Sequence, residues 1–239
     1  MRSPANLAKH IRKLLRDYGS PEHAAGVQHF FQEEVRSHGW RAADLRNAAV
    51  RMRRAILAHA GPDYLLQVAD RLFRGRVLEE KVMAVLLLEK SLPEFGGREF
   101  RQLESWLDRV TTWADHDSLV HILLGPLLVA EPRRAKSALR WAKSQHVWHR
   151  RAAAVVLIYG ARREMFEPEI RRVAQLLLRD ENLMVQKGLG WLLREWGKKS
   201  PQRATPFLLK MRRRAPRLVL RTACEKLSQP QRAKILALK

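Results

Sequence analysis

The sequence predicts an all-α protein built as an α-solenoid, which is a stack of short helical repeats. Apolar residues recur at three- and four-residue spacing along the chain, and no run alternates with period two. Glycines and prolines fall between the periodic segments. Similar segments also recur every 35 or 36 residues, which is a period typical of stacked helix pairs.

The residues between the periodic segments predict where helices begin and end. Ser3-Pro4 and Ser20-Pro21 are typical of an N-cap followed by a first turn. Pro132 is expected to open the helix over residues 135–142. No connection longer than a few residues is expected, so residues 1–239 are predicted to form one continuous domain. Several glycines are expected to end helices or lie in loops: Gly19, Gly61, Gly75, Gly96, Gly97 and Gly160.

Four segments align with one another, and each has a basic or potentially basic residue at the same position. These residues are Lys81, His116, Arg151 and Lys187, with spacings of 35, 35 and 36. Equivalent positions of a solenoid fall on one face, so we expect a basic row on the concave surface of a superhelix. The repeats would be short HEAT-like repeats. Coincidence among many basic residues is the alternative.

The charge of the chain predicts a polyanionic partner. Lys and Arg number 46 against 24 Asp and Glu, which gives a net charge of +22, and residues 181–239 alone carry +12. Arginine outnumbers lysine 33 to 13, and its planar guanidinium makes bidentate contacts to phosphate. Nucleic acid is therefore the expected partner. A solvated basic surface without a partner is the alternative.

Other features of the sequence narrow the class of protein. No apolar run approaches the length of a membrane span, and the amphipathic N-terminus lacks a signal-peptide pattern. The single cysteine, Cys224, excludes an intramolecular disulfide framework and is expected to be buried and inert. We therefore expect a cytoplasmic protein, in the bacterial cytosol or nucleoid. No metal site is predicted, since His116, Asp117 and His121 lack a standard ligand spacing.

Two segments carry residues suited to chemistry or to binding. Trp113 and Asp117 are four residues apart, so a helix places an indole beside a carboxylate, a pair that can hold a cation or an electron-poor sugar. The alternative is that Trp113 is core and that Asp115 or Asp117 caps a helix. Further along, Lys187, Trp191 and Arg194 fall on one helical stripe, which suits a phosphate backbone. Trp191 as a core residue is the alternative there.

Together these segments resemble the AlkD-type DNA alkylation repair glycosylases, a family of HEAT-like repeat proteins. The resemblance rests on residues 113–119, 147–153 and 185–195, and its most specific part is the run Gln-Lys-Gly-Leu-Gly-Trp-Leu-Leu-Arg-Glu at 186–195. It covers roughly residues 75–215. The first 70 or so residues match only in helix pattern, and the basic tail is looser.

The resemblance implies roles for particular residues. Asp117 would be the catalytic carboxylate, with Trp113 and Trp191 as the aromatic walls of the cleft. Arg151 would approach the DNA backbone near the lesion. His116 departs from the family pattern, which often has an apolar residue there. The expected DNA contacts are, in full, Arg151, Lys187, Arg194, Arg150 and Lys81.

The activity implied is a DNA glycosylase acting in base excision repair. Its substrate would be duplex DNA with positively charged N3- or N7-alkylated purines, hydrolysed without a cofactor by a monomeric enzyme. Because the resembled family grips the backbone and leaves the lesion outside a pocket, bulky adducts are expected to be tolerated. A non-catalytic protein that binds bent, branched or damaged DNA is the main alternative. A helical scaffold for protein or RNA is a third.

Overall fold

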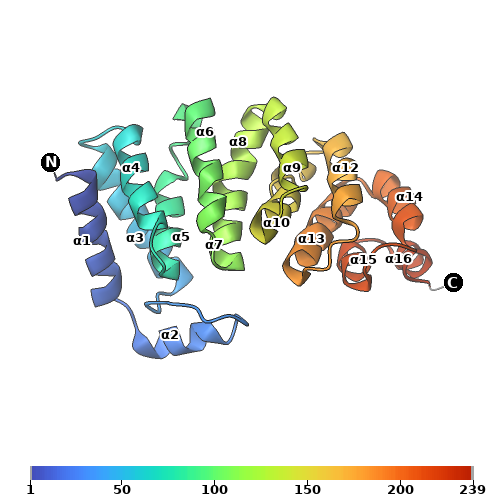
Figure 1. Cartoon of the computed structure of the whole chain (residues 1–239), viewed down its shortest axis with the longest axis horizontal. Helices are drawn as coiled ribbons and strands as arrows, with labels where there is room; N and C mark the ends of the chain where they lie inside the picture. Colours follow the sequence, from blue (N-terminus) through green and yellow to red (C-terminus); the bar gives the residue numbers. More distant parts are fainter. Residues whose placement is uncertain (1, 238–239) are drawn as a thin grey trace. The chain divides into compact units, whose positions relative to one another are not determined.

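The computed structural model describes residues 2–237, and within them every regular element is a helix. The backbone divides into two compact units, Met1–Leu123 and Leu124–Lys239. The prediction of an all-α solenoid of helical repeats is confirmed (Figure 1). The single continuous domain stays a prediction.

The first unit contains seven α-helices among its described residues and three further helical turns, one of them a π-helix that ends at the first residue of the second unit. Helix α5 packs against both α3 and α7, and α1 packs on α4. The bounds of the α-helices are α1 Pro4–Asp17, α2 Pro21–Gln28, α3 Ala42–Leu57, α4 Pro62–Phe73, α5 Leu78–Leu88, α6 Gly97–Glu104 and α7 Trp113–Asp117. The turns are the 3-10 helices Leu92–Glu94 and Ser105–Arg109 and the π-helix Ser118–Leu124.

The second unit repeats the same arrangement. Helix α13 packs against both α10 and α15, and α9 packs on α12. The bounds are α8 Gly125–Ala130, α9 Lys136–Trp141, α10 Val147–Val155, α11 Ile158–Ala161, α12 Glu167–Leu177, α13 Leu183–Lys199, α14 Pro201–Met211, α15 Arg217–Ala223 and α16 Gln229–Leu236. Pro132 opens a 3-10 turn, Pro132–Ala135, that leads into α9, as its position in the sequence predicts.

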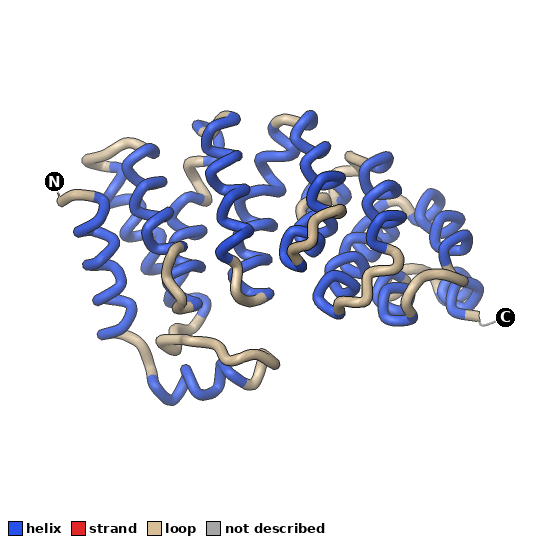
Figure 2. The backbone as a smooth tube through the Cα atoms, in the orientation of Figure 1, coloured by secondary structure: helices blue, strands red, loops and turns tan. Residues whose placement is uncertain are grey.

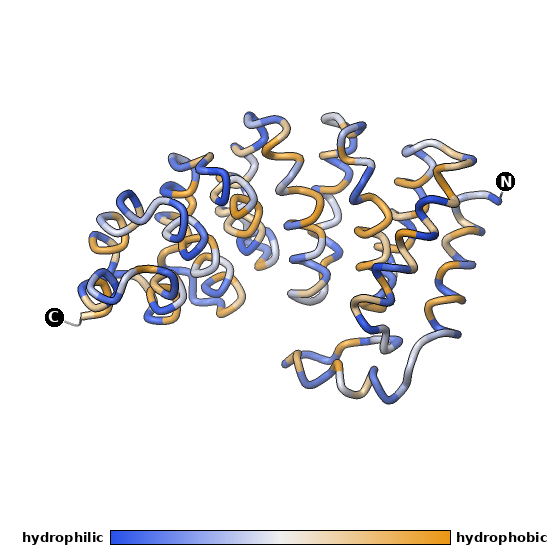
Figure 3. The backbone as a smooth tube through the Cα atoms, turned by 180° about the vertical axis from the view of Figure 1, so that it is seen from behind, coloured by the Kyte–Doolittle hydropathy of each residue, from blue (hydrophilic) through white to orange (hydrophobic). Residues whose placement is uncertain are grey.

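The period of the sequence is visible in the helix starts. Helices α3, α5, α7, α10, α13 and α15 begin 36, 35, 34, 36 and 34 residues apart. Hydrophobic positions recur along each helix with polar positions between them (Figure 3). The repeat therefore extends on both sides of the part of the chain where the sequence motifs are clearest.

The expected helix starts are confirmed at Ser3 and Ser20, and the structure adds a packing role for Gly160. Each serine Oγ accepts a hydrogen bond from a backbone N–H three residues on, at 3.3 and 3.2 Å. Gly160 lies one residue before the end of α11, and a Cβ on it would lie 2.2 Å from the Phe166 ring. That glycine is present for close packing, which a sequence pattern does not reveal.

The prediction of short connections is wrong for residues 29–41, a long segment without regular helix between α2 and α3 (Figure 2). Side chains replace helical hydrogen bonds there. The Gln28 amide donates to Glu33 O at 2.8 Å and accepts from Val35 N–H at 2.9 Å. The buried Glu79 carboxylate accepts from Ser37 Oγ at 2.6 Å and from three consecutive backbone N–H groups, those of His38, Gly39 and Trp40. The segment thus has a defined conformation.

Candidate functional site

Helix α7 is the element that carries Trp113 and Asp117, and its first turn is held by Asp115. Thr112 is the N-cap residue, and its N–H and hydroxyl donate to Asp115 Oδ1 at 2.7 and 2.5 Å. The Thr111 N–H donates to the other carboxylate oxygen at 3.0 Å. The capping role considered for Asp115 or Asp117 therefore belongs to Asp115.

Lys81 corrects a prediction, since it was expected to contact DNA. Its side chain is 1% exposed and forms an ion pair of 2.9 Å with Asp115, which is 0% exposed. The ammonium also donates to Thr111 Oγ1 at 3.1 Å and to the Arg109 carbonyl. Its three donors are thus directed inside the first unit, where they fix the start of α7 instead of binding phosphate.

Trp113 and Asp117 share the accessible side of α7, as their spacing predicts. Both are half-buried, whereas Asp115 and His116 between them are buried. The Asp117 side chain is 19% exposed, and its Oδ1 lies 2.6 Å from His116 Nδ1. Because a carboxylate accepts hydrogen bonds, the Nδ1–H of His116 is the donor, and it orients Asp117. A π-helix begins at the next residue, Ser118.

Phe31 is a neighbour of this site that the sequence did not reveal. Its ring stacks on Trp113 with a centroid distance of 5.1 Å and an interplanar angle of 19°. Phe31 lies in the segment that Gln28 holds, 82 positions before Trp113 in the chain. An aromatic residue in an irregular segment carries no periodic signal, so only tertiary structure pairs the two rings.

In the second unit, α13 presents a stripe of accessible side chains. Spacings of three and four residues separate Met184, Lys187, Trp191, Arg194 and Lys198, all of which are half-buried or exposed. The predicted stripe of Lys187, Trp191 and Arg194 is present on this face. Arg194 also pairs with Glu225 at 2.9 Å and Glu195 at 3.4 Å, so part of its charge is neutralised within the unit.

Two glycines explain the Gly-Leu-Gly part of the motif on α13. A Cβ on Gly190 would lie 2.8 Å from Thr222 Cβ of α15, and one on Gly188 would lie 3.2 Å from Arg151 Cγ of α10. These glycines let α13 approach both neighbours closely. The close packing holds Trp191 and Lys187 in place on the accessible side.

Arg151 and Arg150 are less accessible than the sequence suggests. Arg151 is 5% exposed, and its Nη1 donates to Met184 O at 2.6 Å, which ties α10 to α13. Arg150 pairs with Asp180 at 2.6 Å and donates to the carbonyls of Ser144 and Gln145. Their contacts with DNA stay predictions.

The expectation of a basic row on the surface is wrong for three of its four members. Lys81, His116 and Arg151 are buried, and Lys187 is exposed. Lys81 and Arg151 join their helices to the next one in the stack, and His116 contacts Asp117 of its own helix. A shared position in a repeat therefore marks a packing role here, although the residue types are those of a phosphate-binding site.

Two titratable side chains of the second unit, Glu195 and Cys224, have shifted pKa values. Burial raises the pKa of Glu195, but hydrogen bonds and charge from Arg162 and Arg194 outweigh it and hold that pKa below its ordinary value. Burial raises the pKa of the Cys224 thiol to about 11, with Arg232 and Arg217 acting in the opposite direction. Cys224 is buried, so its reactive thiolate form is scarce at neutral pH.

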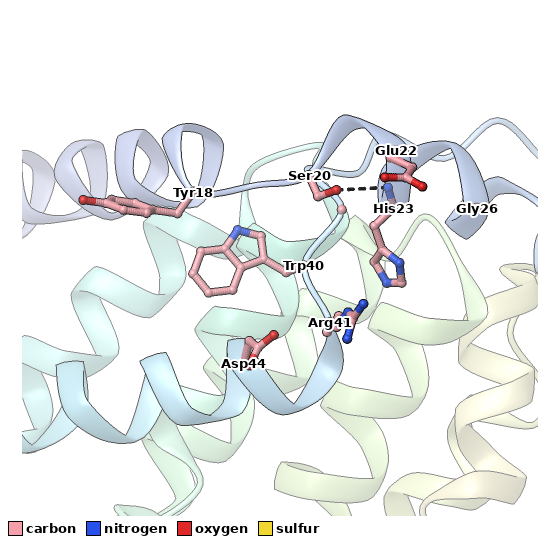
Figure 4. A pocket seen from close by; sticks show the side chains of 9 residues that line it. Tyr18, Ser20, Glu22, His23, Gly26, Trp40, Arg41 and Asp44 are labelled. Carbon is pink, nitrogen blue, oxygen red and sulfur yellow. Dashed lines mark hydrogen bonds between the residues drawn. The ribbon is translucent and has the colours of Figure 1, made fainter.

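A hollow of about 610 Å³ in the first unit differs in character from these surfaces (Figure 4). Trp40 lines it, and its indole N–H donates to Leu15 O at 2.7 Å. Glu22 and Asp44 face it together with His23 and Arg41. Because its carboxylates balance its cations, this hollow does not have the character of a polyanion site.

Between residues 2 and 237, no group of three or more His, Cys, Asp or Glu side chains is arranged to hold a metal ion. None of the helices in that range is long and apolar enough to cross a membrane.

Fold and surface define a helical-repeat protein with basic and aromatic residues on accessible helix faces. The chain matches the family of DNA alkylation repair enzymes over residues 11–227, and it belongs to that family. Its fold is similar to that of a predicted DNA alkylation repair enzyme from Enterococcus faecalis, with a TM-score of 0.79 and 16% identity over 88% of this chain and 97% of that one. A search of curated protein sequences gave no match. Family membership supports a role in the repair of alkylation damage, with DNA as the substrate.

Proposed function

We propose that this protein is a DNA glycosylase that hydrolyses the N-glycosidic bond of positively charged N3- or N7-alkylated purines in duplex DNA. The observation that carries the proposal is the position of Asp117. It is a partly exposed carboxylate on the same side of α7 as Trp113, on a helix whose start is held by Lys81 and Asp115. The other carboxylate of this turn, Asp115, is buried and holds the start of the helix, whereas Asp117 lies on its accessible side.

The leaving group explains why one carboxylate is sufficient. An alkylated purine is already cationic, so it departs as a neutral base with the electron pair of the C1′–N bond, and no general acid is needed. Positive charge then develops on the deoxyribose. Asp117 stabilises that charge and orients the attacking water, whose proton passes to the carboxylate or to solvent. His116 donates to Oδ1 at 2.6 Å and fixes the carboxylate orientation.

The aromatic residues complete the proposal. The negative face of the Trp113 ring, supported behind by Phe31, attracts the developing cation on the sugar. We assign Trp191 to the same substrate, and Lys187 and Arg194 to backbone phosphates. A site that grips sugar and phosphate leaves the size of the adduct unrestricted, so methylated and bulky cationic purines should both be excised.

Release of free base from a duplex with one N7-methylguanine tests the proposal. Wild type should release the base, and Asp117→Asn should be slower by roughly 10²–10³-fold with binding retained, because the charge that stabilises the transition state is lost. Asp63→Asn is the matched control, since Asp63 is an exposed carboxylate paired with Arg98 in the same unit. It should leave the rate unchanged.

Near-normal turnover by Asp117→Asn would remove Asp117 from the chemistry. Tight binding of every duplex in a panel of N3-methyl, N7-methyl and bulky cationic lesions, without release of base by the wild type, would contradict a glycosylase and favour a protein that binds damaged DNA without excision.

A further inference from the structure

A second cavity in the first unit lies next to α7, with a volume of about 390 Å³. Thr112, the N-cap of α7, lines it together with Thr111, and Trp113 follows directly in the chain. Arg36 and Arg76 line the same cavity. Two guanidiniums therefore face a hollow adjacent to the helix that carries Asp117.

The backbone holds these two arginines beside each other. Residues Arg36 and Val77 form an isolated parallel bridge, and the Leu78 N–H donates to Arg36 O at 2.9 Å. The segment before Arg36 is fixed by Gln28, and the segment after it by the buried Glu79. The backbone at both arginines is thus held in place before any partner binds, so no entropic cost arises from ordering it.

Within residues 2–237, the Arg36 and Arg76 side chains form no ion pair or hydrogen bond, and both are exposed. Nearby arginines behave differently, since Arg74 and Arg109 pair with Asp70 at 2.9 and 2.8 Å. The arginines at the cavity therefore retain their full positive charge. Glu34 also lines the cavity, and its negative charge opposes the entry of an anion.

We propose that Arg36 and Arg76 bind one backbone phosphate of the DNA strand whose sugar lies at Trp113 and Asp117. This rests on the proposed function. Two guanidiniums offer paired N–H donors, the geometry that suits the oxygens of a single phosphate. The hollow shown in Figure 4 has no such excess of cations. The phosphate contact sets the register of the strand, so Arg36 and Arg76 are positioning residues.

The test is a double-mutant cycle, in which the two arginines and the charge of single phosphates are removed separately and together while binding affinity is measured. The probe is a duplex with a 2′-fluoro analogue of the N7-methylguanine nucleotide, in which the fluorine suppresses cleavage so that binding is measured alone. Each linkage near the lesion is replaced in turn by a neutral methylphosphonate. Wild type should lose about tenfold in affinity at one linkage. The Arg36→Gln/Arg76→Gln double variant should show a similar loss on the normal duplex and no further loss at that linkage.

Arg101→Gln is the matched control, because Arg101 is an exposed arginine of the same unit that does not line the cavity. It should keep the wild-type methylphosphonate profile. Glu34→Gln should bind the normal duplex more tightly than wild type. The unfolding midpoint of the double variant should equal that of wild type, since neither arginine has an internal partner.

The same methylphosphonate profile in wild type and double variant would overturn the phosphate clamp. Base release from the N7-methylguanine duplex is measured separately. If one linkage matters in wild type and not in the double variant, but no base is released, the clamp is upheld and the proposed function is contradicted. If base is released but the two methylphosphonate profiles agree, the proposed function is upheld and the clamp is contradicted.

Discussion

Two carboxylates two residues apart have different surroundings in α7, because they lie on different faces of the helix. Asp115 is fully buried and satisfied by Thr111, Thr112 and Lys81. Asp117 lies on the accessible face beside Trp113. Chemical type alone does not distinguish these residues, but their burial and hydrogen-bond partners do.

Asp70 is a carboxylate with a structural role, since three side chains donate hydrogen bonds to it. It accepts hydrogen bonds from Trp106 Nε1 at 2.9 Å, Arg109 at 2.8 Å and Arg74 at 3.0 Å. Burial raises its pKa, but Arg109, Arg74 and Trp106 outweigh that effect and hold the pKa below the ordinary value of 3.8. A carboxyl with a lowered pKa stabilises the fold above its unfolded pKa, and this contribution is lost as the pH falls through the folded pKa.

We therefore predict that Asp70→Asn lowers the free energy of unfolding by about 2 kcal/mol at pH 7, because charge-assisted hydrogen bonds are lost. The difference from wild type should shrink as the pH falls below 3.8, the ordinary pKa of the group. Urea unfolding at a series of pH values measures it, with Asp63→Asn as the exposed control. A difference that stays constant with pH would contradict the linkage.

The start of helix α7 depends on a buried ion pair between its own Asp115 and a lysine of α5. Lys81 comes from α5, and the pair is surrounded by hydrogen bonds from residues 111 and 112. A buried charge that loses its partner is strongly destabilising. Lys81 therefore acts on the candidate site by positioning the helix that carries Trp113 and Asp117.

Lys81→Met should lower the free energy of unfolding by about 3–5 kcal/mol, because Asp115 is left buried and unpaired. The double variant Lys81→Met/Asp115→Asn should be destabilised by less than the sum of the two single variants. Lys90→Met, at an exposed lysine just beyond the same helix, is the control. Unchanged stability of Lys81→Met, with weaker DNA binding and a shallower salt dependence, would restore Lys81 as a phosphate contact.

At the scale of the whole molecule, a net charge of +22 disfavours the compact state through self-repulsion. Many of the arginines are paired internally, as Arg150, Arg162 and Arg194 are. The excess charge nevertheless has no internal counterpart, since basic residues outnumber acidic ones by almost two to one. A polyanion should relieve the repulsion and bind with a steep dependence on salt.

The affinity for a duplex should fall by roughly 10³-fold or more between 50 and 200 mM salt if six or more phosphates are contacted. Added duplex should also raise the unfolding midpoint, because it binds the folded state. Fluorescence anisotropy and thermal unfolding measure the two effects. A shallow salt dependence would show that few of the basic residues contact phosphate.

The fold class, the repeat and the family could all be predicted from the amino-acid sequence. Hydrophobic periodicity and a period near 35 residues are local properties of the chain, and the structure confirms them in the starts of α3, α5, α7, α10, α13 and α15. The i to i+4 spacing likewise put Trp113 and Asp117 on one face. Helix geometry depends on near neighbours, so such features can be predicted without a tertiary structure.

The accessibility of the basic residues and the surroundings of α7 depend on how distant segments of the chain pack. Lys81 and Arg151 look like surface cations in the sequence, yet both are buried. Their partners, Asp115 and Met184 O, lie more than 30 positions further along the chain, so the sequence pattern does not reveal them. The stacking of Phe31 on Trp113 and the pairing of Arg36 with Arg76 at one cavity depend on an irregular segment held by Gln28 and Glu79. Burial and long-range hydrogen bonds arise only when distant segments pack, and no local pattern in the sequence encodes them.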